Sequence, residues 1–468
     1  MDGCKVSCHP VSGEPLPSQV EVLIHDHPCY SEEAHYHYAR MHLPVAPACN
    51  IQCRYCNRLY DCVNESRPGV TSEVLSPQKA AQKVQIVARR MPQVSVVGVA
   101  GPGDPLANPE KTFQTFQMVS RMVPDVRLCL STNGLALLDH VDVLKELGVD
   151  HVTITINAID PQIGKEIYQW VHFDRKRYTG QEAAAILIER QLAGLEALSQ
   201  KGILCKVNSV LIPGVNDEHL QEVSKTVKSL GAFLHNIMPL IVVSGTDYAA
   251  RGFRGPTLAE RKRVQELCGG QVRLMHHCRQ CRSDAIGLLS EDLSQERIEE
   301  SLTGQEEYGP TQRQQARQKI EEDIQRIRAV EERLKESSNE DRAPITAAVA
   351  SKGHGVVNEH FGHAKEFLVY EASGSGIKLV QVRKIEQYCR GPATCGDEED
   401  LLDQIANMLS DCQHLLCSRI GPEPRRFLEA RGIKCVETHN FIHEALADLV
   451  LGESTEPLMS TQSVGATS

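Results

Sequence analysis

The chain has 468 residues, of which 41% are hydrophobic and 24% charged, and its formal net charge is −11 at pH 7. This composition is that of a globular protein with about two domains. The acidic balance argues against a nucleic-acid partner, because phosphate binding requires a concentrated basic surface. The absence of a long apolar run argues against a membrane partner, and the polar N-terminus is unlike a secretory signal. We therefore expect a cytoplasmic protein.

The chain contains 17 cysteines. In a reducing cytoplasm a disulfide framework is disfavoured, so metal or iron–sulfur ligation is the leading interpretation. Some cysteines lie in apolar segments or lack a nearby cysteine, and we expect these to be small buried hydrophobic residues: Cys205, Cys268, Cys412, Cys417 and Cys435. Cys4 and Cys8 lie in a polar N-terminal stretch and stay without an assigned role.

In chain order, a histidine-rich segment with Cys29 and His42 comes first, followed by LPVAPA as the first β-type run. Further β-type runs then alternate with helical stretches as far as about residue 240: VSVVGVA, VRLCLSTNG, HVTITIN, LCKVNSVLIPG and FLHNIMPLI. The helical stretches include KTFQTFQMVSRMV and a long one that ends at a C-cap glycine, Gly202. This alternation predicts a parallel sheet with outer helices, either open or curled into a barrel.

Two of the predicted strands carry a polar row on one face. In VRLCLS, Leu128 and Leu130 share one face, and Cys129 lies on the other with Arg127 and Ser131. In VTITIN, Ile154 and Ile156 oppose a row made by Thr153, Thr155 and Asn157. A strand covered on both sides carries such a row only where it faces a wet or liganded interior. We therefore expect Cys129 to point into a cavity rather than into the core.

Residues 291–343 are charged and rich in opposite charges at helical spacing, which predicts a solvated helix joining two domains. A second pattern of short strands and helices begins at PITAAVAS and predicts a compact α/β unit. The polar tail after Gly452 is expected to be disordered.

The stretch CNIQCRYC places Cys49, Cys53 and Cys56 within eight residues. A closed zinc site needs four ligands, whereas three thiolates suit a cubane iron–sulfur cluster with one iron left open. Spacing alone leaves a zinc or redox site as the alternative. Cys278 and Cys281, in HHCRQC after the last predicted barrel strand, form a second ligand pair, for which structural zinc is again the alternative.

The C-x3-C-x2-C spacing, with Tyr55 before the last cysteine, resembles the signature of the radical S-adenosylmethionine (SAM) superfamily. In that superfamily the open iron binds the methionine group of SAM, and an electron from the cluster cleaves SAM to a 5′-deoxyadenosyl radical. GPGDPL follows a strand and resembles the glycine-rich motif that contacts the methionine amino group, with Asp104 where many members have glutamate. The resemblance implies SAM contacts at Tyr55, Gly101, Gly103, Asp104, Ser131, Asn133, Thr155, Asn157, Val207 and Asn208.

The larger set of cysteines, His42, the NESRPG motif and HHCRQC resembles the radical SAM proteins of nitrogenase cofactor biosynthesis. The resemblance implies that a radical 4Fe–4S cluster is joined by two substrate clusters, K1 and K2. K1 would be held by His42, Cys62 and Cys129, and K2 by Cys29, Cys278 and Cys281. The implied reaction fuses the two clusters, adding a sulfur and a SAM-derived carbide, to make the eight-iron cofactor precursor. Glu65 would move protons or bond a cluster, although a loop carboxylate paired with Arg67 is equally consistent.

NEHFGHAKEFLVYE resembles the small domain of nitrogenase cofactor carrier proteins, in which His360, His363, Cys389 and Cys395 would hold a cluster in transit or serve a structural or docking role. The fold class expected is α/β, with a partial (β/α)6 radical SAM barrel, a charged helical linker and a small ribonuclease H-like domain. The expected divisions are 1–43 (N-terminal ligand segment), 44–290 (barrel and its CxxC extension), 291–343 (linker), 344–452 (small domain) and 453–468 (tail).

The implied partners are iron–sulfur cluster donors, an electron donor of the ferredoxin or flavodoxin type, and cofactor carrier or scaffold proteins. Two other functions stay open at this point. One is a different radical SAM enzyme with permanent auxiliary clusters, which would not need a cysteine in the barrel interior. The other is a non-catalytic iron–sulfur scaffold, which would leave GPGDPL, Tyr55 and the polar interior row unexplained.

Overall fold

The computed structural model describes residues 16–64, 69–278, 280–289, 307–337, 344–353, 355–385, 388 and 398–452. It divides into two compact units, Met1–Arg317 and Gln318–Ser468. In the described residues, no helix is both long and apolar enough to cross a membrane. The finer domain boundaries given above stay a prediction.

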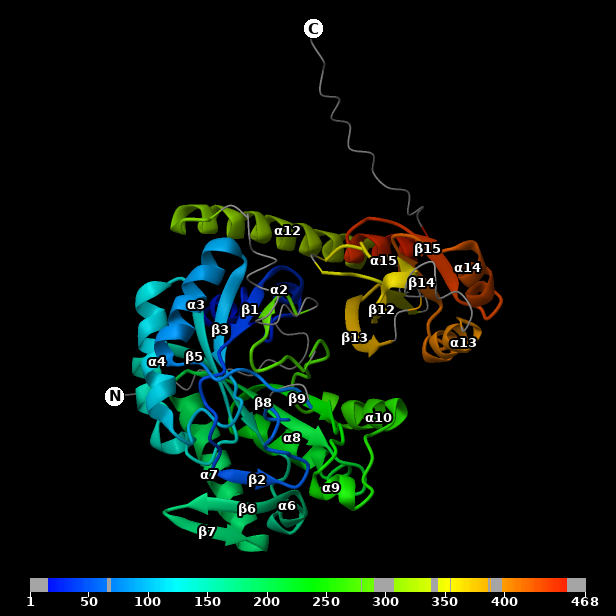
Figure 1. The fold of residues 1–468 in the computed structure, drawn as a ribbon. Helices are drawn as coiled ribbons and strands as arrows, with labels where there is room; N and C mark the ends of the chain where they lie inside the picture. The colour runs from blue at the N-terminus through cyan, green and yellow to red at the C-terminus, as the bar shows by residue number, and fades with distance from the viewer. Residues whose placement is uncertain are drawn as a thin grey trace. The chain divides into compact units, whose positions relative to one another are not determined.

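The first unit is built on a curled sheet of seven strands in the order β10-β1-β3-β4-β5-β8-β9 (Figure 1). All neighbouring pairs are parallel except β10 with β1. The strands are β1 (Ala39–His42), β3 (Val94–Val99), β4 (Arg127–Thr132), β5 (Val149–Thr155), β8 (Leu204–Leu211), β9 (Ala232–Pro239) and β10 (Ile286–Gly287). The six parallel strands confirm the predicted partial (β/α)6 barrel.

Helices cover the outer face of this sheet because each presents an apolar stripe to it. In α3 the stripe is formed by Ala80, Val84 and Val87, and Ser76 caps the first turn by accepting from the Lys79 backbone N–H. The helices of the first unit that follow the N-terminal segment are α3 (Pro77–Arg90), α4 (Pro109–Met122), η1 (Leu137–Asp139), α5 (Val141–Glu146), α6 (Pro161–Ile167), α7 (Gly180–Gln200), α8 (Leu220–Ser229), α9 (Asp247–Ala250) and α10 (Leu258–Gly269).

The long helix α7 ends as predicted. Gly202 has a positive φ of 65°, and the Ile203 backbone N–H bonds the Leu198 carbonyl at 3.0 Å. A residue with a side chain is strained in this left-handed conformation, so glycine terminates the helix at low cost.

The prediction that LPVAPA forms the first strand was wrong. LPVAPA forms only an isolated bridge between Ala46 and Pro102, and the first strand is instead β1, with the sequence ARMH. This strand was overlooked because Arg40 and His42 break its apolar pattern. Sequence reasoning also missed a separate three-stranded sheet of β2 (Ile51–Cys53), β6 (Tyr168–Phe173) and β7 (Lys176–Thr179), in which β2 and β7 have only three and four residues.

The HHCRQC segment does not directly follow a full barrel strand, because α9 and α10 intervene after β9. Leu274 forms an isolated bridge to His235 of β9 before the chain continues to β10 beside β1. The segment therefore links the two edge strands of the open barrel.

The N-terminal segment contains α1 (Ser18–Ile24) and α2 (Glu32–His37) and packs at the start of the barrel strands. The Tyr30 hydroxyl donates to the Val152 carbonyl at 3.1 Å and the Leu204 carbonyl at 3.3 Å. Arg127, the first residue of β4, pairs with Asp26. These contacts fix the segment that carries Cys29 against this end of the barrel.

The second unit has a five-stranded sheet in the order β13-β12-β11-β14-β15, with β12 antiparallel to both of its neighbours. The other neighbouring pairs are parallel, so order and directions are those of the predicted ribonuclease H-like domain. Its elements are β11 (Ile345–Val349), η2 (Phe361–His363), β12 (Glu366–Ser373), β13 (Gly376–Lys384), α13 (Glu398–Met408), β14 (His414–Cys417), α14 (Pro422–Glu429), β15 (Lys434–Glu437) and α15 (Ile442–Leu451).

The predicted linker helix exists as α12 (Pro310–Ser337), but it is not fully solvated. In the second unit, Ile324, Ile327 and Leu334 are buried at 3%, 2% and 0% exposure. Arg326 pairs with Glu444 of α15 at 2.9 Å. The charged composition concealed a narrow apolar stripe, because three aliphatic residues are enough to anchor this part of the helix.

Candidate functional site

The three clustered cysteines lie on the loop that carries β2, close to the carboxyl ends of the barrel strands. Cys49, Cys53 and Cys56 line a cavity of about 230 Å³ together with Gly103 and Asp104. Burial raises the pKa of the Cys49 thiol to about 12 and also raises the pKa values of Cys53 and Cys56. These thiols are therefore protonated near neutral pH without metal, and metal binding must displace their protons.

Two amide side chains donate to the sulfurs of this group. Asn133 Nδ2 lies 3.7 Å from Cys49 Sγ, and Asn64 Nδ2 lies 3.8 Å from Cys53 Sγ. Hydrogen bonds to ligating sulfurs stabilise negative charge on them and tune the reduction potential of a bound cluster. Asn64 was not predicted, although it is only two residues beyond Cys62.

The GPGD loop packs directly against the backbone that precedes Cys49. The Gly103 and Asp104 amides each donate at 2.6 Å, to the Ala46 and Ala48 carbonyls respectively. A Cβ at Gly103 would lie only 2.1 Å from the Ala48 oxygen, so no other residue fits there. This glycine thus lets the two loops meet at the edge of the cavity.

The Asp104 carboxylate is buried and is used within the protein. It accepts from the Asn133 backbone N–H at 2.6 Å, from the Leu106 N–H at 2.9 Å and from the Thr132 hydroxyl. Burial nevertheless raises the pKa of Asp104. Its evident effect is to hold Asn133 at the end of β4, facing the cysteines.

Tyr55 joins the loop to two strand ends. Its hydroxyl donates to Asn64 Oδ1 at 2.6 Å and accepts from Asn157 Nδ2 at 2.7 Å. Asn157 Oδ1 accepts from the Val210 N–H, and Asn208 Nδ2 donates to the Asn64 carbonyl. These residues thus form one buried network beside the cysteines, in which Tyr55, Asn157 and Asn208 were predicted as SAM contacts.

The remaining predicted contacts differ in position. Ser131 and Thr155 lie on the inward face of the sheet, because they align with Thr153 and Asn208. The Val207 side chain is instead fully buried in the apolar core, so only its backbone is available to a ligand. Gly101 lies under Ser283, where a Cβ would come within 2.6 Å of the Ser283 hydroxyl oxygen.

Deeper in the barrel, strand register brings His42 and Cys129 together. His42 aligns with Gly98, and Gly98 aligns with Cys129, so all three share one face of adjacent strands. A Cβ at Gly98 would lie 3.4 Å from His42 Cδ2 and 3.7 Å from Cys129 Cβ. The glycine leaves open the space between these two predicted ligands. Leu128 and Leu130 are buried on the opposite face, as the alternation predicted.

His42 is oriented by a backbone carbonyl. Its Nδ1 lies 3.0 Å from the Arg282 oxygen, which can only accept, so Nδ1 carries the proton and Nε2 is the nitrogen available for a metal. Burial, reinforced by Arg40, lowers the pKa of His42 to about 4. The imidazole is therefore neutral near pH 7, as ligation requires.

Cys29, Cys278 and Cys281 form a second group, near the start of the strands. Burial raises the pKa of Cys29 to about 11, with smaller opposing effects of Lys206 and Arg40 and reinforcing effects of Cys281 and Cys278. Arg40 Nη2 donates to Cys281 Sγ at 3.2 Å, and Arg40 Nη1 is fixed by the Gly287 and Leu288 carbonyls at 2.6 and 2.9 Å. Two cations therefore lie beside these three thiols.

The donor set of the cysteine loop fits an iron–sulfur cluster. In the described residues, no group of three His, Cys, Asp or Glu side chains converges closely enough to hold a single metal ion. A cubane takes one ligand at each iron corner, so its ligands stand apart around a larger volume. The cavity beside Cys49, Cys53 and Cys56 offers such a volume.

Cys62 and Glu65, two further predicted site residues, were assigned to K1 and to proton movement respectively. Cys62 lines the same cavity as the radical-type cysteines, and its assignment to K1 stays a prediction. Glu65 lies outside the described residues, as do Cys389 and Cys395 of the small domain. The five cysteines predicted to be core residues are all buried: Cys205, Cys268, Cys412, Cys417 and Cys435.

Sequence reasoning missed several interior residues. Arg40 is two residues before His42 and therefore lies on the same face of β1. Lys206 aligns with Thr153, and His151 aligns with Cys129. The alternation rule would have found all three, because His151 lies two residues before Thr153 on β5, just as Arg40 precedes His42 on β1 and Lys206 precedes Asn208 on β8.

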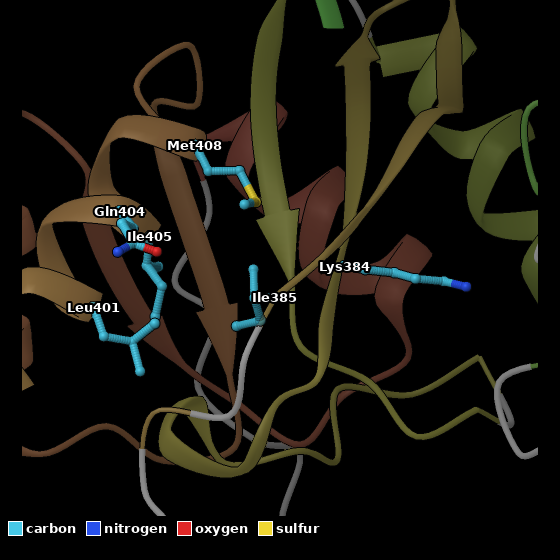
Figure 2. Close-up of a pocket in the computed structure, with 6 residues that line it drawn as sticks. All are labelled: Lys384, Ile385, Leu401, Gln404, Ile405 and Met408. Carbon is cyan, nitrogen blue, oxygen red and sulfur yellow. The ribbon is translucent and has the colours of Figure 1, made fainter. Parts of the chain in front are cut away.

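The second unit contains its own cavity of about 290 Å³ between β13 and α13. Figure 2 shows Lys384 extending away from the other five lining side chains, which are mainly aliphatic: Ile385, Leu401, Gln404, Ile405 and Met408. His360, the N-cap of η2, and His363, its last residue, have ring centroids 5.0 Å apart. Whether they bind a cluster stays a prediction.

Comparison with known proteins agrees with both units. Residues 43–227 match the Radical SAM superfamily, and residues 343–452 match the family described as dinitrogenase iron-molybdenum cofactor. The FeMo cofactor biosynthesis protein NifB of Frankia alni is 50% identical over 467 residues, covering 96% of this chain and 92% of that protein. The NifB protein of Azotobacter vinelandii is also 50% identical, over 90% of this chain and 86% of its own length.

The barrel and its three-cysteine loop thus define a radical SAM enzyme, and its class implies a 4Fe–4S cluster and SAM. A small cofactor-type domain is fused to it. The chain belongs to the NifB family of FeMo cofactor biosynthesis proteins, which act in nitrogen fixation.

Proposed function

We propose that this enzyme fuses two 4Fe–4S substrate clusters, K1 and K2, into the eight-iron precursor of the FeMo cofactor, inserting a SAM-derived carbide and one further sulfur. The observation that carries the proposal is the presence of two donor groups in addition to the radical-type cysteines. One pairs His42 with Cys129 across Gly98, and the other combines Cys29, Cys278 and Cys281.

The first group suits a substrate that must be held and later released. Cys129 supplies a thiolate, and the neutral His42 imidazole is a ligand that protonation can displace. Cys62 completes this K1 set in our proposal. The second group supplies three thiolates for K2, and Arg40 and Lys206 offset their negative charge.

Cys49, Cys53 and Cys56 would hold the radical cluster, which supplies the electron for reductive cleavage of SAM. The protein residues around it bind and orient: Asn133 and Asn64 donate to ligating sulfurs, and Tyr55 ties the loop to β5 through Asn157. In the proposed reaction, one SAM supplies the methyl group, and the radical from a second SAM removes hydrogen from it.

The proposed reaction requires partners. Iron–sulfur donors would load K1 and K2, a ferredoxin- or flavodoxin-type protein would supply electrons, and a carrier or scaffold protein would accept the product. The small domain supports a carrier interaction, because it matches a cofactor-associated family.

The test uses anaerobically reconstituted protein supplied with dithionite and SAM labelled in its methyl group. We expect 5′-deoxyadenosine and S-adenosylhomocysteine to form together, with label retained in a protein-bound iron–sulfur species. Formation of 5′-deoxyadenosine alone would indicate a different radical SAM reaction. Formation of neither product by cluster-loaded protein would indicate a scaffold.

A further inference from the structure

A basic hairpin lies directly beside the loop of radical-type cysteines. It is formed by β6 and β7, and its sequence HFDRKRY has three consecutive basic residues, Arg175, Lys176 and Arg177, all exposed. Asp174 and Arg175 form its tip, with positive φ values of 47° and 61°. Two successive left-handed residues are typical of a tight type I′ turn, so the hairpin presents these charges on a short, defined support.

The hairpin is hydrogen-bonded to the cysteine loop itself. β6 pairs with β2, aligning Trp170 with Gln52 and Tyr168 with Cys53 (Figure 1). Gln52 Nε2 in turn donates to the Cys53 and Cys56 carbonyls at 3.1 and 2.8 Å. A protein bound on this hairpin would therefore sit one strand away from the cysteines that would hold the radical cluster.

Trp170 is the chain's single tryptophan, and two arginines flank its ring. The guanidinium carbons of Arg58 and Arg177 lie 5.1 and 4.8 Å from the ring centroid. Arg58 also donates to the Gln52 side chain at 2.8 Å and to the Cys49 carbonyl at 3.3 Å. The surface charge is thus fixed in place by the same groups that shape the cysteine loop.

The charge of this surface contrasts with that of the whole chain. Arg58, Arg175, Lys176 and Arg177 are opposed within the hairpin only by Asp174, whereas the protein carries a net charge of −11. Leu59, next to Arg58, is 76% exposed. An acidic protein would be repelled by most of the molecule and attracted here, and an apolar residue at the edge of a charged patch suits a small transient interface.

We propose that the β6–β7 hairpin, with Arg58 and Leu59, is the docking surface for a small acidic one-electron carrier protein. This inference rests on the proposed function, in which reductive cleavage of SAM consumes one electron per SAM molecule. The carrier is oxidised by one electron, and the carbon–sulfur bond of SAM breaks to give methionine and the 5′-deoxyadenosyl radical.

The test compares K176E/R177E with the matched reversal K262E/R263E on α10, whose two residues are also exposed. Formation of 5′-deoxyadenosine is measured with dithionite and, separately, with chemically reduced flavodoxin as the acidic carrier, across a series of salt concentrations. We expect K176E/R177E to match the wild type with dithionite but to be slower by about tenfold with flavodoxin at low salt. The difference should disappear at about 1 M salt, where charges are screened within a few ångströms.

The docking surface would be overturned if K176E/R177E forms 5′-deoxyadenosine with flavodoxin as fast as the wild type. It would also be overturned if K176E/R177E and K262E/R263E are slowed equally. If wild-type protein forms no 5′-deoxyadenosine even with dithionite, the proposed function fails instead. The neutral variant K176Q/R177Q should lose less activity with flavodoxin than K176E/R177E. If K176E/R177E is also slower with dithionite, the test rests on K176Q/R177Q, which should match the wild type with dithionite and be slower with flavodoxin.

Discussion

Two groups of cysteines, one in each unit, occupy opposite environments. In the barrel, Cys29, Cys129, Cys278 and Cys281 keep partial exposure and lie beside imidazole, lysine or arginine side chains. In the second unit, Cys412, Cys417 and Cys435 are packed into a core of aliphatic and aromatic residues. The same residue type is therefore a ligand candidate in one group and a small hydrophobic residue in the other, as it also is at Cys205 and Cys268 in the core of the first unit. Its surroundings, and not its number along the chain, indicate its role.

The largest effect is expected from Cys53→Ala. This change removes one of the three thiolates proposed to hold the radical cluster, so reductive SAM cleavage should fall by more than about 100-fold, and roughly one cluster's iron should be lost. The measurement is 5′-deoxyadenosine with dithionite, together with iron per chain. If this variant cleaves SAM at the wild-type rate, the cysteine loop does not hold the radical cluster.

Cys129→Ala should separate the two barrel sites. Cys129 lies deeper than the radical-type cysteines, beside Gly98 and His42, so the change should spare SAM cleavage while blocking formation of the labelled eight-iron product. Iron content and the electron paramagnetic resonance spectrum of the loaded protein provide a readout apart from activity. Loss of all SAM cleavage would count against a substrate-cluster role for Cys129.

Acid should destabilise the metal-free barrel through its interior histidines. Burial lowers the pKa of His42 to about 4 and that of His151 to about 3, below the ordinary value of 6.5. The unfolded chain therefore binds more protons below pH 6.5, so stability is fully present above that pH and is lost as pH falls through about 4.

The corresponding measurement is urea unfolding of metal-free protein at about pH 7.5 and pH 5, where each unit of pKa shift contributes about 1.4 kcal/mol at most. His151→Leu should reduce the difference in unfolding free energy between the two pH values. His172→Asn, at an exposed position, serves as the control and should leave that difference unchanged. If His151→Leu leaves the difference in unfolding free energy between the two pH values unchanged, the pKa of His151 is not lowered by burial.

Cys417→Ala should have the smallest effect. Cys417 is fully buried in the second unit, so replacing it leaves a small cavity that costs about 1 kcal/mol of unfolding free energy. Dithionite-driven SAM cleavage and iron content should not change. Loss of iron from this variant would mean that the second unit's core cysteines bind metal, which would break the contrast between the two units.

Parts of the fold and of the site were predictable from sequence because they depend on local pattern. Strand–helix alternation predicted the barrel, and Gly202 predicted the end of α7. Cysteine spacing predicted that Cys49, Cys53 and Cys56 would gather. The ligand roles stay predictions, since strand alternation places Cys129 on the inward face without assigning it a cluster.

The errors arose where polar residues replaced the expected apolar pattern or where few apolar residues sufficed. β1 was missed because Arg40 and His42 point inward, toward thiols and carbonyls that compensate their burial. The small sheet of β2, β6 and β7 was missed because β2 and β7 are short and the hairpin between β6 and β7 is highly charged. The helix α12 was expected to be fully solvated because its charges outnumber its three buried aliphatic residues.

The sequence by itself determined the class of chemistry, because closely spaced cysteines and glycine-dependent turns act over a few residues. Only the tertiary structure decided which distant residues meet. Parallel register places His42, Gly98, Cys129 and His151 side by side, although 109 positions separate the first from the last (151 − 42). The same is true of Arg40 and Cys281, whose contact depends on β10 returning to pair with β1. Such contacts follow from the packing of the whole sheet, which no local pattern encodes.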